Sequence, residues 1–185
     1  EGLKKDQKFD SPILTPSTKA EYGEHDEPIA RDAIVNGLVE ESIYAQAEEY
    51  ALKLFEAGQE WAAKQGLILV DTKYEFGMVN GELIVIDEIH TPDSSRYWIA
   101  DDYEARFNAG EGQNMLDKEN IRQWLIERGF SGEGTPPALT DEIRVSLAER
   151  YIELYTKLTG QDFHPKLGDV KSRINNNLEK AGIYA

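Results

Sequence analysis

The chain has 185 residues, of which 20 are Lys or Arg and 35 are Asp or Glu, so its formal net charge is −15. With 40% apolar and 10% aromatic residues it is expected to fold around a buried core, and its lack of cysteine excludes a disulfide framework and a thiolate zinc site. The acidic charge argues against a nucleic-acid partner, and the apolar runs, far shorter than the roughly 20 residues that cross a bilayer, argue against a membrane partner.

The first third of the chain predicts a loop followed by a long helix. Residues 11–29 contain three prolines and no sustained period, which is typical of a loop with little regular structure. Apolar and small residues then recur at steps of three and four, which predicts an amphipathic helix over residues 39–65. Gly66 is suited to end this helix, and residues 67–70 predict a strand.

A β-hairpin is the next predicted element. Residues 72–76 alternate in polarity, residues 83–87 are aliphatic and β-branched, and the pair Asn80-Gly81 between them is a strong hairpin signal. Residues 89–116 show no convincing period and are expected to form a long loop, which in a compact domain is usually functional or disordered.

The C-terminal part of the chain predicts three helices. Residues 117–128 are expected to form a helix capped by its first residue. Thr140 caps a second helix, which Gly160 ends, and a weaker helix is expected over residues 169–180. Because the strands cluster between residues 67 and 88, the expected fold class is α+β, with a small antiparallel sheet and a central hairpin packed against several helices.

The hairpin carries the first candidate site. Lys73 and Glu75 share one face of its first strand, and Asp87 ends its second strand. A plain two-residue turn sets Glu75 opposite Ile86, whereas one extra residue in the loop or a bulge sets it opposite Asp87. In that second register the two carboxylates lie side by side, where Mg²⁺ can bind between them. The alternative is that the carboxylates of Glu75 and Asp87 are solvated charges at a strand end. The sequence does not decide between the two registers.

A polar run follows the hairpin. Arg96 offers a planar fork for a carboxylate or phosphate, and Ser94 and Ser95 offer hydroxyl donors. A turn built around Asp93 would have the same composition, so a purely structural role remains the alternative.

Two further groups are weaker candidates. Lys19, His25 and Asp26 lie in the N-terminal loop, where an isolated histidine is most often a surface or structural residue. Lys118 and Arg122 share the polar face of a predicted helix, where cations usually meet only water. No phosphate-binding, dinucleotide-binding, zinc-protease or serine-nucleophile motif occurs, so the residues alone predict an acidic α+β domain with a candidate divalent-metal site.

Five longer segments are more specific. They are LTPSTKAEYGEHDEPI (14–29), LILVDTKYEFG (67–77), DEIHTPDSSRYW (87–98), DKENIRQWL (117–125) and YIELYTKLTG (151–160). In this order they resemble the SAICAR synthetase family, whose full name is phosphoribosylaminoimidazole-succinocarboxamide synthase. The resemblance covers nearly the whole chain, and the insertion after Trp98 resembles the longer form of the family.

The resemblance implies an ATP-dependent ligase of purine biosynthesis. Such an enzyme joins L-aspartate to the carboxylate of carboxyaminoimidazole ribonucleotide (CAIR), giving SAICAR, ADP and phosphate. Glu75 and Asp87 then match Mg²⁺-binding carboxylates, as in the related protein kinases, and Lys73 matches a catalytic lysine near the transferred phosphate. The remaining matches are to substrate-binding residues. These are Asp93, Ser94, Ser95 and Arg96 for the ribonucleotide, Lys19, His25 and Asp26 for the polar N-terminal group, and Lys118 and Arg122 for a basic helix edge.

The resemblance also bears on domain organisation. Residues 1–185 match the C-terminal portion of the family, and the N-terminal nucleotide-binding lobe has no counterpart here. We therefore expect a cytoplasmic enzyme in which that lobe is the partner of this chain, which would be inactive alone. The alternative is a non-catalytic acidic binding module that keeps a related fold and uses residues 89–116 as its partner surface.

Overall fold

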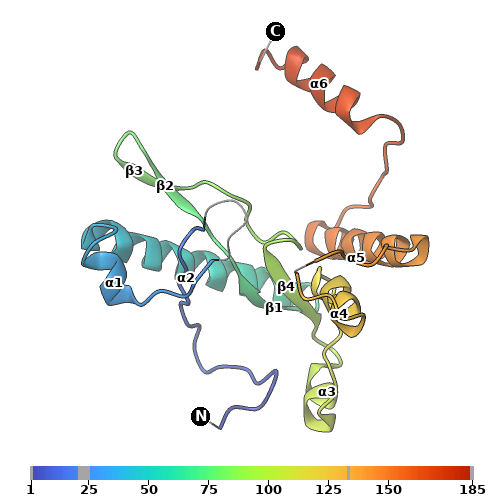
Figure 1. Ribbon diagram of the computed structural model, residues 1–185, viewed down its shortest axis with the longest axis horizontal. Helices are drawn as coiled ribbons and strands as arrows, with labels where there is room; N and C mark the ends of the chain where they lie inside the picture. The colour runs from blue at the N-terminus through green and yellow to red at the C-terminus, as the bar shows by residue number, and fades with distance from the viewer. Residues whose placement is uncertain (1, 21–25, 133, 184–185) are drawn as a thin grey trace.

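The computed structural model describes residues 2–20, 26–132 and 134–183, and it confirms an α+β fold. Within these residues there are six helices and four strands (Figure 1). None of the described helices is both long and apolar enough to cross a membrane. The elements are α1 (Arg31–Val35), α2 (Glu41–Lys64), β1 (Leu67–Thr72), β2 (Phe76–Val79), β3 (Glu82–Val85), β4 (Ser95–Ile99), α3 (Tyr103–Ala109), α4 (Glu119–Glu127), α5 (Asp141–Thr159) and α6 (Val170–Lys180).

The core lies around the antiparallel pair β1–β4, which α2 covers along its length (Figure 1). Leu67 and Leu69 of β1 are each 1% exposed and alternate with less buried residues, as expected for a strand with one face on the core. A register shift between Leu69 and Asp71 places Asp71 opposite Arg96. The other buried members of the core cluster are Ala62, Tyr97, Leu116 and Leu154.

The hairpin β2–β3 is a separate two-stranded sheet and projects away from this core (Figure 1). Its turn is the plain two-residue one, because Val79 pairs with Glu82 and both turn residues have positive φ, 53° at Asn80 and 85° at Gly81. The small antiparallel sheets are therefore confirmed, but the hairpin is not at the centre of the packing. The expectation of a central hairpin is corrected: α2 covers β1 much more extensively than it covers β3.

The strand boundaries also differ from the expectation. Residues 73–75 lie in the connection between β1 and β2 instead of within one strand. The predicted loop over residues 89–116 contains β4 and α3, while α1 had no sequence signal that we recognised. β4 is recognisable only through its pairing with β1, since its own burial does not alternate regularly. The stacked rings of Trp98 and Tyr103 hold α3 against β4, and Phe107 stacks on Tyr103 within α3.

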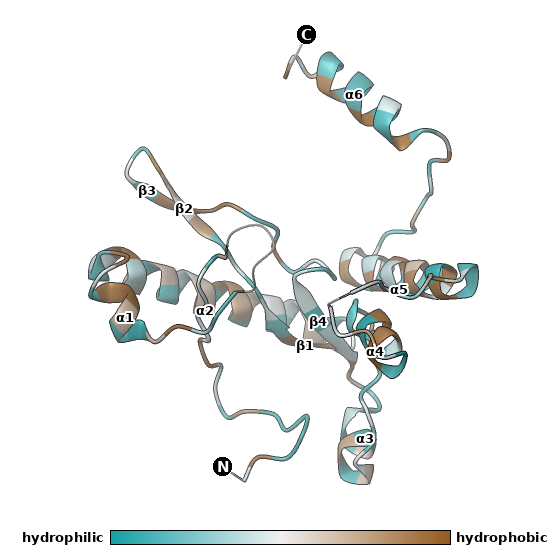
Figure 2. Ribbon diagram, viewed as in Figure 1, coloured by the Kyte–Doolittle hydropathy of each residue, from teal (hydrophilic) through white to brown (hydrophobic). Residues whose placement is uncertain are grey.

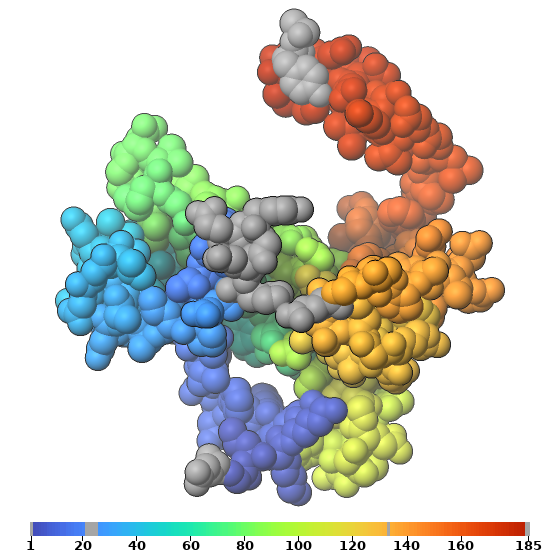
Figure 3. All heavy atoms as spheres, viewed as in Figure 1, coloured from blue at the N-terminus to red at the C-terminus, as the bar shows by residue number. Residues whose placement is uncertain are grey.

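The predicted cap is confirmed for α5, whereas α4 begins at Glu119, two residues later than expected, and its N-cap residue Lys118 makes no side-chain cap. Asp117 is fully buried and accepts a hydrogen bond from the backbone N–H of Glu119 (2.7 Å), at the start of α4. Thr140 caps α5 through the N–H of Ile143, and Asp169 caps α6. Helix α6 stands apart from the rest of the molecule, as both the ribbon and the space-filling view show (Figures 1 and 3).

Candidate functional site

Four of the predicted site residues form one cluster of charges. The carboxylate of Glu75 is bridged by two lysines: Lys19 Nζ contacts Oε2, and Lys73 Nζ lies 3.0 Å from Oε1. Lys73 Nζ also lies 3.3 Å from Asp26 Oδ2. The cluster therefore alternates in sign along the path Lys19, Glu75, Lys73, Asp26, and it brings the N-terminal loop against the β1–β2 connection.

Backbone hydrogen bonds fix both sides of this cluster. The N–H of Lys73 donates to Ser94 O (3.0 Å), which prolongs the β1–β4 ladder, and the N–H of Ile86 donates to Glu75 O (3.0 Å), which prolongs the β2–β3 ladder. On the loop side, the N–H of Thr18 donates to Glu27 O (2.9 Å). Residues 73–75 thus lie where the two sheets meet.

The paired charges shift one another's protonation. Hydrogen bonds from Lys19, and then from Lys73, lower the pKa of Glu75. The pKa of Asp26 is lowered first by the backbone N–H of Ala20 and then by Lys73. The pKa of Lys73 is raised, mainly by its hydrogen bond to Glu75. All of these charged forms are therefore favoured at neutral pH.

The observed hairpin register does not place the two predicted metal ligands opposite each other. Glu75 lies opposite Ile86, the arrangement that the plain two-residue turn dictates. The alternative with one extra loop residue is therefore wrong, because Asn80 and Gly81 alone form the turn. Asp87 is exposed and follows the end of β3, in a bend.

A second group lies at the start of β4. Arg96 is held by Asp71, with Nε 2.9 Å from Oδ1 and a further contact from Nη2 to Oδ2. Asp93 Oδ1 accepts from Lys118 Nζ at 3.0 Å, so the predicted helix-edge cation does meet the polar run. The hydroxyl of Ser94 lies 3.3 Å from the Ser95 hydroxyl.

Among the described candidate residues, Asp87 and Arg122 are not brought into these groups. Arg122 pairs with Glu119 on its own helix at 3.4 Å. His25 lies outside the described residues.

Several neighbours of the site were missed by the sequence reasoning. Asp71 holds Arg96, and Thr72 Oγ1 lies 2.8 Å from the buried hydroxyl of Ser95. Tyr74 Oη lies 2.5 Å from His90 Nε2. The first two follow from the register of β1 against β4, which no local pattern encodes.

The chain matches the family model described as SAICAR synthetase over residues 1–137. It is 54% identical to a phosphoribosylaminoimidazole-succinocarboxamide synthase of Cytophaga hutchinsonii, over 98% of this chain and 59% of that protein. It is 51% identical to the protein of the same name from Bacteroides fragilis, over 96% of this chain and 58% of that protein.

Solved structures agree with these matches. A SAICAR synthase from Saccharomyces cerevisiae complexed with SAICAR has a TM-score of 0.72 and 36% identity, covering 89% of this chain and 52% of that chain. A SAICAR synthetase in complex with ADP has a TM-score of 0.59 and 31% identity, covering 86% of this chain and 55% of that chain. The chain spans somewhat less than three fifths of the length of the curated relatives it matches. On the family model and on these identities, the chain belongs to the SAICAR synthetase family.

Proposed function

We propose that this chain forms part of an ATP-dependent ligase that joins L-aspartate to the carboxylate of CAIR, giving SAICAR, ADP and phosphate in purine biosynthesis. The observation that carries the proposal is the cluster in which Lys73 and Lys19 flank Glu75, in a chain whose family is named for this reaction. The SAICAR and ADP held by two of the similar proteins support the same substrate classes.

The proposed reaction has two steps. The CAIR carboxylate attacks the γ-phosphorus of ATP, so that an acyl phosphate forms and ADP leaves. The aspartate amine then attacks the acyl carbon, and the new C–N bond forms as the nitrogen releases a proton to solvent. The acyl C–O bond breaks, and phosphate departs with the former carboxylate oxygen. Lys73 is the proposed catalytic residue, because a cation at the transferred phosphoryl group offsets the negative charge that develops there.

Glu75 and Asp87 are the proposed holders of Mg²⁺. Both supply hard carboxylate oxygens near one end of the hairpin, and Mg²⁺ is usually bound by one or two carboxylates together with substrate phosphates. The described residues contain no group of three or more His, Cys, Asp or Glu side chains that could hold a metal ion, so phosphate oxygens would have to complete the coordination. When bound, the ion would neutralise phosphate charge, and Glu75 would give up part of its contact with the two lysines.

The second group is the proposed ribonucleotide site. Arg96 uses Nε and Nη2 on Asp71, which fixes the plane of the guanidinium while other N–H groups remain to meet an anion. Asp93, Ser94 and Ser95 supply the neighbouring polar groups, with Lys118 paired to Asp93. Lys19, Asp26 and His25 are proposed for the nucleotide and amino-acid side, and Arg122 for the basic helix edge.

We further propose that residues 1–185 are the C-terminal domain of a cytoplasmic enzyme and that an N-terminal nucleotide-binding lobe completes the cleft. The fraction of the relatives that is matched supports this division. On this proposal the 185-residue chain alone does not turn over.

The proposal is tested by ADP release from the full-length protein with Mg²⁺ and ATP, with CAIR and L-aspartate supplied together and separately. Release should require both substrates. Asp87→Asn and Glu75→Gln should each lower kcat by about a hundredfold or more, since each removes a group proposed to act on the transferred phosphate.

Glu82→Gln is the matched control, because this carboxylate lies on the same hairpin but is exposed at its turn. It should keep the wild-type rate. Wild-type rates in Asp87→Asn and Glu75→Gln would contradict the metal assignment. ATP binding without release under any combination would contradict the ligase and favour the non-catalytic binding module.

A further inference from the structure

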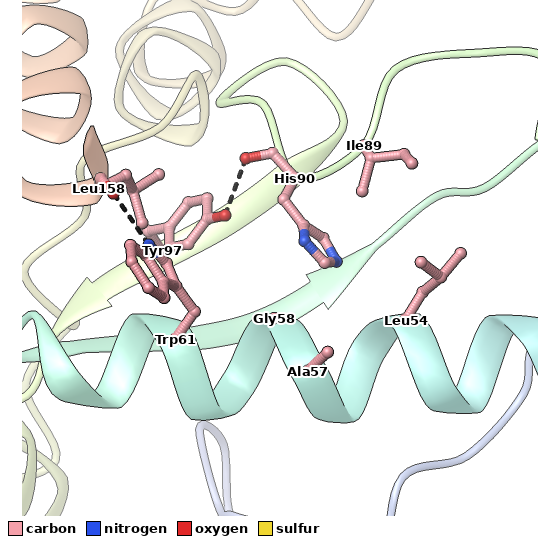
Figure 4. Close-up of a pocket in the computed structure, with 8 residues that line it drawn as sticks. All are labelled: Leu54, Ala57, Gly58, Trp61, Ile89, His90, Tyr97 and Leu158. Carbon is pink, nitrogen blue, oxygen red and sulfur yellow. Dashed lines mark hydrogen bonds between the residues drawn. The ribbon is translucent and has the colours of Figure 1, made fainter.

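His90 occupies an unusual position between the candidate site and the core. Its φ is 58°, in the left-handed region that residues other than glycine rarely adopt. Its side chain points toward α2 at a pocket of about 390 Å³, and its backbone oxygen accepts from Tyr97 Oη at 2.8 Å (Figure 4). Such a strained conformation persists only where surrounding contacts hold it.

The contact with α2 explains a glycine in the middle of that helix. A Cβ atom at Gly58 would lie 2.4 Å from His90 Cε1 and 2.7 Å from Leu69 Cδ2, closer than real atoms approach. Glycine in a helix interior costs about 1 kcal/mol relative to alanine, so the helix gives up some stability where the His90 ring packs against it. Figure 4 shows the ring directly above this position.

The same end of the ring meets Tyr74, because Nε2 lies beside the Cε1 atom that faces Gly58. The Tyr74 Oη and His90 Nε2 atoms are 2.5 Å apart, and the two rings meet edge to face with centroids 5.6 Å apart. Burial lowers the pKa of His90 and raises the pKa of Tyr74, so both groups are neutral at physiological pH. A neutral imidazole pairs with a hydroxyl in either tautomer, as donor or as acceptor.

The two partners belong to different connections of the chain. Tyr74 lies between Lys73 and Glu75 in the β1–β2 connection, and His90 lies between Asp87 and Asp93 in the β3–β4 connection. Backbone hydrogen bonds join the two connections at their ends, from Lys73 N–H to Ser94 O and from Ile86 N–H to Glu75 O. Between these ends the side-chain contact of Tyr74 with His90 is the further tie.

We propose that His90 is a positioning residue, which acts through Tyr74 to hold the connection carrying Lys73 and Glu75 in a fixed relation to the connection carrying Asp87 and Asp93. This inference rests on the proposed function for the roles of those four residues. The coupling itself is a property of the fold and can be measured without turnover.

The test uses the full-length protein in four forms: wild type, Tyr74→Phe, His90→Asn and the double variant. Tyr74→Phe deletes one oxygen and keeps the ring, and asparagine tolerates the left-handed backbone of His90. Amide hydrogen exchange is measured over residues 73–75 and 87–94, with α2 as an internal reference for global opening. Tyr50→Phe is the control, since it removes a tyrosine hydroxyl whose exposed hydrogen bond, accepted from Gln46 Nε2, stays within α2.

We expect either single substitution to speed exchange in both connections by about tenfold while α2 is unchanged, because one shared contact is lost. We also expect kcat for ligation to fall about tenfold in each single variant and no further in the double variant, with the KM for ATP within about twofold. A general loss of folding would instead speed amide exchange in α2 as well. In that case the kcat losses of the two single variants would add up in the double variant.

Exchange that rises only in the substituted connection, or kcat losses that multiply in the double variant, would overturn the positioning role. If the wild-type protein shows no ligation, the proposed function fails, and the exchange measurements still decide whether His90 couples the two connections.

Discussion

The two small sheets are built from similarly apolar residues, yet one is buried and the other is exposed. In β1, Leu67 and Leu69 are each 1% exposed. In and after β3, Ile84 is 39% exposed and Ile86 is 54% exposed. In the hydropathy view the projecting hairpin carries apolar residues (Figure 2).

The difference comes from what covers each sheet. α2 lies across β1 and packs the fully buried Ala62 into the core with Leu154 of α5. The hairpin has no such cover along its length within the described residues, and an isolated two-stranded sheet is only marginally stable in water. Apolar content alone therefore does not distinguish a core strand from an exposed one.

The junction of the two sheets is where the candidate site lies. Lys73 and Glu75 are each tied by a backbone hydrogen bond to a different sheet, the first to the buried one and the second to the hairpin. A rigid core thus positions one side of the site, and a less covered hairpin positions the other. This arrangement makes contacts between the connections, such as Tyr74 with His90, important for the geometry of the site.

Truncating one residue in each sheet should give the largest contrast. Leu69→Ala should lower the free energy of unfolding by about 3 kcal/mol, because it leaves a cavity in a closed core. Ile84→Ala should lower it by less than about 1 kcal/mol, since that side chain is already partly in water. Urea unfolding followed by circular dichroism measures both, and equal losses would contradict the comparison.

Removing the buried carboxylate of Asp117 should have the next largest effect. Burial raises the pKa of Asp117, yet its oxygens accept from the backbone N–H of Tyr97 (2.8 Å) and of Glu119 (2.7 Å). Asp117→Ala leaves both donors unpaired and should lower the free energy of unfolding by about 2 kcal/mol. Asp117→Asn should lower the free energy of unfolding by less, because the amide oxygen of asparagine can still accept a hydrogen bond from one of these N–H groups.

The exposed Glu127 at the end of the same helix provides the control, since its carboxylate lies at the unfavourable end of the helix dipole. Glu127→Ala should leave thermal unfolding nearly unchanged. If Glu127→Ala lowered the stability as much as Asp117→Ala does, the loss would come from any change of charge in α4. It would then not come from the buried contact of Asp117 with β4.

The smallest expected effect is a pH dependence at the junction. Since lysine contacts lower the folded-state pKa of Glu75 below its ordinary value of 4.5, the stability that it contributes is fully present above pH 4.5. It is lost as the pH falls through the lowered pKa. The contribution should be less than about 1 kcal/mol, because Lys19 and Lys73 are mostly in solvent.

Thermal unfolding across the acid range on both sides of pH 4.5 measures this effect. Above pH 4.5 the wild type should be more stable than Glu75→Gln. This difference in stability should disappear as the pH falls and Glu75 is protonated. A difference that stays constant with pH would show that the ion pairs do not contribute, and that Glu75 acts only through its size.

Much of the local structure could be predicted because its causes lie within a few residues. The period of residues 39–65 predicted α2 to within two residues at its N-terminal end, and Gly66 has the expected positive φ of 70°. Thr140 caps α5 as expected. For the site, the types of residues and their grouping by segment could be predicted, and the resemblance identified the family.

The sequence by itself determined α2, α4, α5 and α6, the cap at Thr140, the place of the Asn80-Gly81 turn and the acidic character of the chain, since these depend on side chains one to four positions apart and on composition. Only the tertiary structure decided which apolar strand is buried, that β4 pairs with β1, and that Glu75 meets Lys19 and Lys73 instead of Asp87. Those outcomes depend on contacts between residues that are distant in the sequence, where burial of apolar area and pairing of charges compete across the whole fold.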